Sequence, residues 1–354
     1  MSDDPETDAP DALPPDAVQQ LVARADAPVF WPLRLRRRLG RAGLAGGIVA
    51  VAFLLLAWAA AGGWRPGGMP TGQVGEALFL ALSLGLIVEL AALIPRSAQD
   101  DLDALAGELT IDRASFGRLR ASLIRYPSGD VAANAAIGLV IGLGHVTLIG
   151  SGAAVLSGDP LAAVLALGTV ALWAMMVQTG TLLVANARLF AQLGRCGARV
   201  ELLVLDRLSP FATAALRPML LVMVLLAAYP LLLLDVEGLE ASAAVGPVAT
   251  ALLALAVVWL PLRGLRARIR EARRLHLARI DTAITAALQS VDGNGAPADP
   301  QRVEALIRLR SRVQAAPAVP IGLGGIGRGL LYLALPMVTW GGKGFAEALL
   351  NWLF

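Results

Sequence analysis

The chain carries little charge and almost no cysteine or histidine. Charged residues make up 16% of its 354 residues and hydrophobic residues 56%, whereas a soluble domain usually carries about a quarter charged residues. This balance excludes a water-soluble enzyme and a disordered chain. A single cysteine, Cys196, excludes a disulfide framework, and two histidines exclude a histidine-rich metal site. We therefore expect an integral membrane protein that is not an enzyme and uses no cofactor or metal.

Lysine is also nearly absent, because Lys343 is the only lysine among the 30 basic residues. A net charge of +3 and a pI of about 9.6 would suggest a nucleic-acid partner in a soluble domain. Here the arginines stand between long apolar runs, and no aromatic residues are interleaved with them. The positive charge therefore indicates membrane topology, and we expect no nucleic-acid partner.

Seven apolar runs approach the length of about 20 residues that a helix needs to cross a bilayer. The fifth run is short and contains Pro230, and the seventh contains Pro336, Lys343 and Glu347. The runs predict an all-α fold, a polytopic membrane helix bundle with about seven transmembrane helices. They cover residues 44–64, 74–94, 131–156, 161–186, 219–234, 243–262 and 329–353.

The arginines predict the orientation of this bundle, because positive charge near helix ends stays in the cytoplasm. Arginines are dense before the first run, between the second and third, between the fourth and fifth, and after the sixth. The opposite loops hold Arg65 alone and the acidic residues Asp235, Glu237 and Glu240. We expect a multi-pass protein of the cytoplasmic (inner) membrane, with its N-terminus inside and its C-terminus outside.

The chain divides into four expected segments. Residues 1–28 are rich in Asp, Pro and Ala, with no apolar stretch behind a basic start, so they predict a disordered acidic tail rather than a signal peptide. Residues 29–262 form the six-span membrane bundle, with amphipathic cytoplasmic helices at 96–130. A cytoplasmic helical hairpin follows at 263–316, and an elbow and the seventh span occupy 317–354.

The hairpin is predicted from apolar residues mostly three, four or eight positions apart between Leu265 and Leu288, a turn at 292–295, and Asp299-Pro300 as the start of a second helix. Its first helix should be continuous with the sixth span. Arginines on it favour contact with anionic lipid head groups at about 1 kcal/mol each. The more ordinary interpretation is topological charge on a solvated face. The candidate lipid contacts are Arg263, Arg266, Arg270, Arg273 and Arg274.

A proline followed by an apolar residue precedes three of the predicted helices, at Pro32-Leu33, Pro210-Phe211 and Pro320-Ile321. Proline suits a first helical turn because its missing N–H would lack a partner there anyway. We expect three interfacial elbows, where a helix lies on the membrane before it turns into it.

These elbows support a family resemblance. Trp31-Pro32-Leu33, the run 199–203 with Leu208-Ser209-Pro210-Phe211, and the segment 332–336 with Trp340-Gly341-Gly342 resemble an uncharacterised family of prokaryotic multi-spanning membrane proteins. That family has Trp-Pro-Phe-like elbows and a helical hairpin before its last span. The chain departs from it at Val319-Pro320-Ile321, where an aromatic residue is usual, and at Lys343. The resemblance implies the seven-span layout and no chemistry.

Polar residues inside the predicted spans are the candidate functional groups, because a charge there costs about 2.5–3.5 kcal/mol on insertion scales. One interpretation is a polar path for a cation or proton through spans two to four. The more ordinary one is that the carboxylate reaches the interface or pairs with an arginine, and that the amides bond across helices. A histidine in mid-span either carries protons or is a buried hydrogen-bonding residue. The candidates are Glu89, Asn134, His145, Gln178, Thr179 and Asn186.

Two further patterns have structural explanations. Lys343 in a seventh span invites comparison with retinal proteins, but the chain has only 5% aromatic residues to line such a pocket, and Glu347 lies four residues away as an ion-pair partner. The glycines of 322–327 match a dinucleotide fingerprint in letters but join no strand to a helix. Spacing for close helix approach occurs at Gly325 and Gly329 and at Gly138 and Gly142.

The sequence leaves two functions open. The first is a channel- or transporter-like homo-oligomer that moves an ion or small solute along the polar residues of spans two to four. The second is a membrane-anchored scaffold or sensor, in which the hairpin docks a cytoplasmic protein partner or reports the state of the membrane.

Overall fold

The described part of the chain is built from helices. The computed structural model describes residues 22, 24–40, 43–62, 71–148, 152–196, 198–202, 204–233, 241–289, 299–317 and 327. These residues contain no strand, and only two isolated β-bridges, Val29–Arg125 and Leu109–Ala198, so the all-α prediction is confirmed for them. The predicted seventh span with Lys343 and Glu347, the third elbow and the Gly325/Gly329 pair lie outside the described residues.

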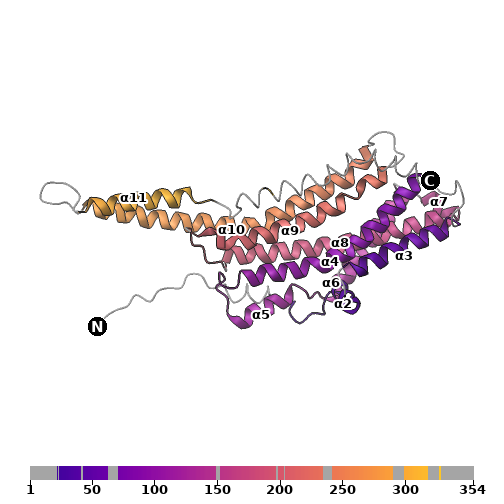
Figure 1. Cartoon of the computed structure of the whole chain (residues 1–354), viewed down its shortest axis with the longest axis horizontal. Helices are drawn as coiled ribbons and strands as arrows, with labels where there is room; N and C mark the ends of the chain where they lie inside the picture. The colour runs from indigo at the N-terminus through magenta and orange to yellow at the C-terminus, as the bar shows by residue number, and fades with distance from the viewer. Residues whose placement is uncertain are drawn as a thin grey trace.

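The helices lie side by side along one long axis, and two of them extend beyond the rest at one end (Figure 1). They are α2 (Trp31–Leu39), α3 (Leu44–Ala60), α4 (Thr71–Ala104), α5 (Arg113–Ser122), α6 (Ser128–Leu148), α7 (Gly152–Leu156), α8 (Pro160–Cys196), the 3₁₀ turn η1 (Leu205–Leu208), α9 (Ser209–Leu226), the 3₁₀ turn η2 (Tyr229–Leu233), α10 (Ala241–Gln289) and α11 (Pro300–Ala315).

Several helices have the length and surface of membrane spans. Four apolar stretches, Gly72–Ala104, Ser128–Leu148, Pro160–Arg195 and Leu205–Leu232, are long enough to cross a bilayer, and α2 with α3 makes a fifth if the bent pair counts as one span. Large aliphatic side chains lie exposed on α3 and α6, among them Val140 at 70%. A soluble monomer rarely exposes such a surface, so the helices are compatible with an integral membrane protein.

The helix ends differ from the predicted spans. α4 continues through Pro95 to Ala104 instead of ending at Ile94. The first of the two amphipathic helices expected in 96–130 is therefore not separate but forms the end of α4. Leu102, near that end, and Leu105, just beyond it, are completely buried. The run 131–156 is divided between α6 and α7, and α8 extends past residue 186 to Cys196. Apolar run length underestimates a helix whose continuation is amphipathic.

Glycines bring the central helices into backbone contact. On α6, a Cβ added at Gly138 would meet the Cα of Ala174 on α8, and one at Gly142 would lie 2.7 Å from the Cα of Val170. The prediction that these two glycines permit close helix approach is confirmed. On α4, a Cβ at Gly85 would lie 2.7 Å from the carbonyl oxygen of Gly46 on α3.

A third crossing of this kind joins α8 to α10. A Cβ added at Gly194 would lie 3.0 Å from the backbone nitrogen of Leu265, and one at Gly264 would overlap the carbonyl oxygen of Ala191. This crossing lies at the end of the bundle from which α10 extends. It fixes the direction in which α10 leaves the bundle.

A hydrophobic cluster, which we call the junction core, closes the same end of the bundle. The end of α4, α5, the end of α8, the start of α9 and the middle of α10 all contribute to it. Beside it, Arg217 forms an ion pair at 3.2 Å with Asp101, whose side chain is 6% exposed. The most buried members are Leu102, Leu105, Leu119, Leu123, Phe190, Leu193, Leu208, Phe211, Leu265 and Ile269.

The packed part of the chain begins earlier than expected. Val22 is 8% exposed and belongs to the junction core, and Ala25 is buried as well. Phe30 packs against Tyr126 with ring centroids 5.5 Å apart. The predicted tail at residues 1–28 therefore overlaps the packed structure from Val22 onward.

The bend of the first expected elbow is present, and the second expected elbow has no such bent helix pair. α2 begins at the predicted Trp31-Pro32 and meets α3 at 97°, with Gly40 and Gly43 in left-handed conformation between them. α9 also begins beside its proline, but only the four-residue turn η1 precedes it. Phe211 is fully buried against Phe190 in the junction core, so it cannot lie among head groups.

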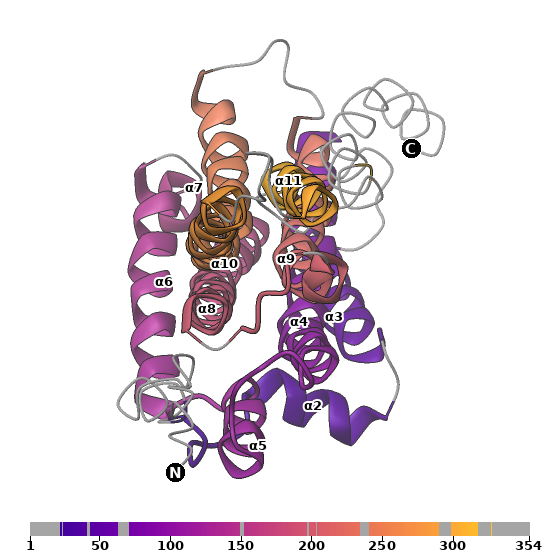
Figure 2. The same ribbon diagram turned by 90° about the vertical axis from the view of Figure 1, so that its left-hand side faces the viewer.

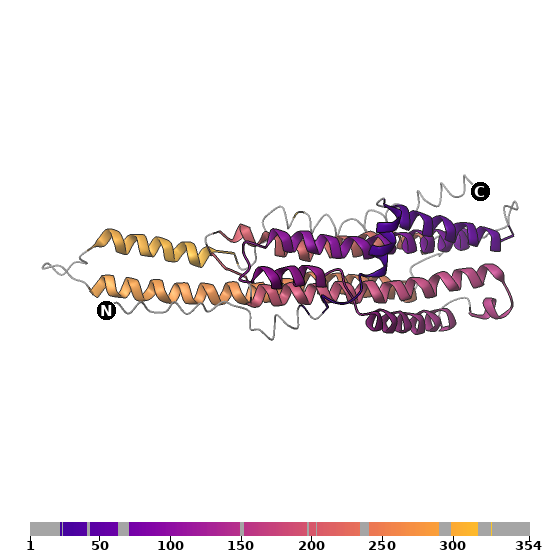
Figure 3. The same cartoon turned by 90° about the horizontal axis from the view of Figure 1, so that it is seen from below.

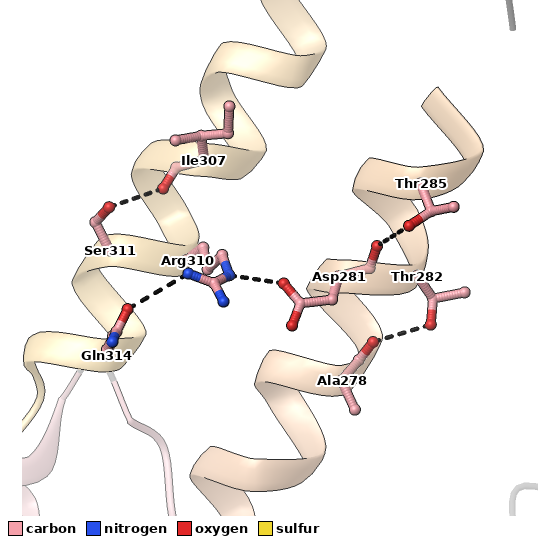
Figure 4. A network of polar contacts seen from close by, with 8 residues as sticks. All are labelled: Ala278, Asp281, Thr282, Thr285, Ile307, Arg310, Ser311 and Gln314. Atoms are coloured by element: carbon pink, nitrogen blue, oxygen red, sulfur yellow. Dashed lines mark hydrogen bonds and ion pairs between the residues drawn. The ribbon is translucent and has the colours of Figure 1, made fainter. Parts of the chain in front are cut away.

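The predicted hairpin is formed by α10 and α11, and its first helix is continuous with the sixth apolar run. We call α10 from Arg263 onward, together with α11, the arm; it projects from the bundle (Figures 1 and 3). Arg310 Nε donates to Asp281 Oδ1 at 2.7 Å and ties the two helices together (Figure 4). Asp299 caps α11, as predicted, by accepting from the backbone N–H of Arg302 at 3.0 Å.

Substitution of the α6 glycines tests the close helix contact. We expect Gly138→Ala to destabilise the protein by about 1–3 kcal/mol, because its Cβ would meet backbone atoms that cannot rotate away. Gly144→Ala is the matched control, since a Cβ there meets nothing within 4 Å and alanine favours helix. The midpoint of thermal unfolding in lipid nanodiscs should fall for the first variant only. Equal midpoints would contradict the contact.

Candidate functional site

Glu89 caps a neighbouring helix. Its Oε1 accepts a hydrogen bond of 3.0 Å from the backbone N–H of Gly46, the third residue of α3. The first N–H groups of a helix have no partner within that helix, and they carry partial positive charge. A carboxylate on α4 satisfies one of them and is favoured by the dipole of α3. Since Cβ at position 46 would lie 2.8 Å from Glu89 Cγ, the contact requires glycine there.

Gln178 and Asn186 anchor two segments to α8. Trp31 Nε1 on α2 donates to Gln178 Oε1 at 3.1 Å. The Tyr126 hydroxyl, between α5 and α6, donates to Asn186 Oδ1 at 3.1 Å. Burial raises the pKa of Tyr126, so its hydroxyl stays protonated and remains a donor. Both amides therefore act as acceptors that hold aromatic side chains at the same end of the bundle.

Asn134 and Thr179 lie in different surroundings. Asn134 Nδ2 on α6 donates to Thr181 Oγ1 on α8 at 3.0 Å, an interhelical bond close to the glycine crossing. Thr179 is buried at 7% exposure, and its Oγ1 has no hydrogen-bond partner among the described residues. Asn186 Nδ2 lies seven residues further along the same face of α8. It is also buried and has no hydrogen-bond partner among the described residues.

His145 lies apart from the other candidates. It is near the far end of α6, with its ring centroid 6.0 Å from that of Trp173 on α8. Five of the six candidates thus enter different helix contacts: Glu89 faces α3, while the three amides and His145 contact α2, α8 or Tyr126. The interhelical bonding that the sequence suggested as the ordinary interpretation is present for Glu89, Asn134, Gln178 and Asn186.

The five arginines predicted to contact lipid also lie in different surroundings. Arg263 lies over the ring of Trp259 at 5.2 Å, and that tryptophan is 53% exposed. Arg266 and Arg270 are exposed, and Arg274 pairs with Glu271 at 3.4 Å. Arg273 instead donates to the carbonyl oxygen of Ala316 at the end of α11. Its guanidinium therefore holds the hairpin together and is not free for a head group.

The arm extends far beyond Arg263. An α-helix rises about 1.5 Å per residue, so Arg270 lies about 10 Å and Arg279 about 24 Å further along α10. Charges are screened over about 8 Å at physiological salt. In the outer part of the arm Arg308 and Arg310 pair with Glu304 and Asp281, but three other arginines there are exposed and form no ion pair among the described residues. We call Arg279, Arg302 and Arg312 the distal arginines.

Two features of this region escaped prediction from the sequence. The first is the ion pair of the buried Asp101 with Arg217, which joins α4 to α9 at 3.2 Å; neither predicted span reached that far. The second is the contact of Trp259 with Arg263. Its signal was available, because tryptophan and arginine four residues apart lie on one face of a helix.

Substitution of Glu89 separates a cap from a permeation residue. We expect Glu89→Ala to lower stability by about 1–3 kcal/mol, because the N–H of Gly46 loses its acceptor. Glu89→Gln keeps an acceptor oxygen and should cost about 0.3–1 kcal/mol, the charge–dipole contribution. Thermal unfolding of both variants in nanodiscs measures the difference. If Glu89→Ala is as stable as the parent protein, Glu89 does not cap α3.

No family model, curated protein or solved structure matches this chain. Among the described residues, no three His, Cys, Asp or Glu side chains form a group that could hold a metal ion. The described residues form an all-helical structure, and its several apolar stretches are compatible with an integral membrane protein.

Proposed function

We propose that this protein is a membrane-anchored scaffold or sensor. Its helix bundle holds the arm at the cytoplasmic surface of the inner membrane, and the distal arginines dock an acidic face of a cytoplasmic protein partner. The observation that carries this proposal is the arm itself. It is a helical pair that projects from the bundle and exposes arginines with no ion-pair partner among the described residues (Figure 3).

The base of the arm supports a docking role because it has a fixed direction. α10 enters the arm without a break, and Gly264 brings it against the backbone of Ala191. Leu265 and Ile269 are fully buried in the junction core, and Val313 of α11 is 2% exposed in the same cluster. An arm held in this way presents its charges at a defined place, which lowers the entropy cost of binding.

The charge of the arm favours an acidic partner. Residues 263–316 contain eleven arginines and five acidic residues, a net charge of +6. Such a surface attracts an oppositely charged partner and speeds association. The distal arginines lie about 24 Å or more past Arg263, too far to contact the head groups beside the bundle.

The orientation forms part of the proposal. α5 and the arginine-rich arm lie toward one end of the bundle, and α2, which also carries arginines, lies between that end and α7 at the other (Figure 1). Under the positive-inside rule the end with α5 and the arm, which is turned toward the viewer in Figure 2, faces the cytoplasm. With the apolar run 329–353 as a seventh span, the N-terminus is inside and the C-terminus outside.

The channel interpretation is the second candidate, and one observation favours it. Ser83 Oγ, Thr179 Oγ1 and Asn186 Nδ2 are buried without hydrogen-bond partners among the described residues, on the helices α4 and α8. Buried polar groups of this kind need a partner such as water or an ion. An oligomer that conducts an ion along α8 would supply one.

Crosslinking from the arm tests the docking function. A benzophenone amino acid at position 307, an exposed site on α11, should capture an acidic partner in cells. We expect Arg279→Gln/Arg302→Gln/Arg312→Gln to reduce that product about tenfold, since three exposed pairs of about 0.5 kcal/mol each add to about 1.5 kcal/mol. The matched control removes three exposed α2 arginines, as Arg34→Gln/Arg37→Gln/Arg38→Gln, and should retain the product. An equal loss in both variants would contradict docking on the arm.

Ion flux in proteoliposomes separates the two functions. If the protein is a scaffold, flux of cations, anions and protons should equal that of empty vesicles. A variant in which a short Gly-Ser linker replaces residues 282–309 is the matched test, since Asp281 and Arg310 pair across the gap and the fully buried members of the junction core are kept. Flux above background that persists in this variant and falls in Glu89→Gln would make the channel the primary function.

A further inference from the structure

The distal arginines have a complementary segment in the same chain. Residues 1–21 contain six acidic residues and no arginine or lysine, whereas residues 263–316 carry a net charge of +6. We propose that the acidic segment 1–21 docks on the distal arginines of the arm and competes there with the acidic partner. This inference rests on the proposed docking function, to which it adds regulation.

The acidic segment ends, at residue 21, next to the cluster that anchors the arm. Val22, which directly follows it, is buried in the junction core, the cluster to which Leu265 and Ile269 of the arm also belong. A stretch of 21 residues spans up to about 70 Å when extended. Arg279 lies about 24 Å beyond Arg263, so the segment reaches the distal arginines.

The distal arginines are available for such a contact. Arg273, Arg308 and Arg310 are engaged within the arm, by Ala316, Glu304 and Asp281 respectively. The distal arginines are exposed and without an ion pair among the described residues. Each exposed pair contributes at most about 1 kcal/mol, so several must act together at the high effective concentration that tethering gives. The contact is then sensitive to salt and can be displaced by a partner.

The arginines of α2 are a nearer basic surface, but they suit the segment less well. α2 meets α3 at 97°, so it lies along the membrane surface if α3 crosses the bilayer. Anionic head groups there compensate Arg34, Arg37 and Arg38 and repel an acidic chain. The distal arginines stand past the screening length of about 8 Å. The negative charge of the membrane therefore repels the segment from α2 but not from the distal arginines.

Distance measurement within the full chain tests the contact. Donor and acceptor dyes are placed at Ser2→Cys and Ser311→Cys in a Cys196→Ser background, with one copy in each anionic nanodisc; position 311 is exposed on α11 (Figure 4). We expect the transfer efficiency to fall by about half between about 0.05 M and about 0.5 M salt, because screening weakens the contact. It should be low at every salt concentration in a variant with Asp3→Asn, Asp4→Asn, Glu6→Gln, Asp8→Asn, Asp11→Asn and Asp16→Asn.

Two controls decide between the surfaces. Arg279→Gln/Arg302→Gln/Arg312→Gln should lower the efficiency as much as neutralising the segment, and Arg34→Gln/Arg37→Gln/Arg38→Gln should leave it unchanged. A transfer efficiency that does not change with salt concentration, or that falls only in the α2 variant, overturns the proposal. The crosslinking experiment at position 307 tests the docking function independently of the dye distance. A partner product that depends on the distal arginines, without a charge-dependent dye distance, rejects the intramolecular contact and keeps the docking function.

Discussion

The close approach of helix backbones at glycine is the constraint on which the rest of this structure depends. Lipid tails are as apolar as leucine, so a membrane bundle gains little from burying aliphatic side chains, and packing must come from short backbone distances. The crossings at Gly46/Gly85, Gly138/Gly142 and Gly194/Gly264 supply those distances. Each also fixes something else: the first brings Glu89 to the start of α3, the second allows Asn134 to reach Thr181, and the third sets the direction of the arm.

The polar residues of the bundle follow from this packing. When two backbones touch, a carboxylate or amide at the crossing meets groups of the neighbouring helix and not solvent. α8 contacts most of the bundle, so its amides accept bonds from Trp31 and Tyr126, and its Thr181 accepts one from Asn134. These bonds account for most of the polarity that suggested a permeation path. Thr179 and one nitrogen of Asn186 are the remainder, which is why flux is still worth measuring.

The sequence predicted much of the fold and little of the site. Apolar runs located the helices, proline placed the starts of α2 and α9, and the spacing of Gly138 and Gly142 indicated a real contact. The ends of α4 and α8 were missed because their last turns are amphipathic and are buried by tertiary contacts. The partners of Glu89 and Gln178 could not be read from the chain, since the spans are apolar nearly all round and give no helix rotation. Residue type identified these positions, but only the packing shows that Glu89 faces the N-terminus of α3.

The length of the arm decides what its arginines can bind. A helix that ended within one screening length of the bilayer would keep its charges beside the head groups. α10 instead continues to Gln289, and past about 8 Å its arginines no longer experience the membrane charge. There Arg274, Arg308 and Arg310 pair with acidic residues of the arm, whereas the distal arginines form no ion pair among the described residues. Exposed charge of one sign repels itself and favours binding of the opposite charge. This exposed positive charge is the physical basis of the proposed docking of an acidic chain, and the acidic segment 1–21 of the same chain ends next to Val22.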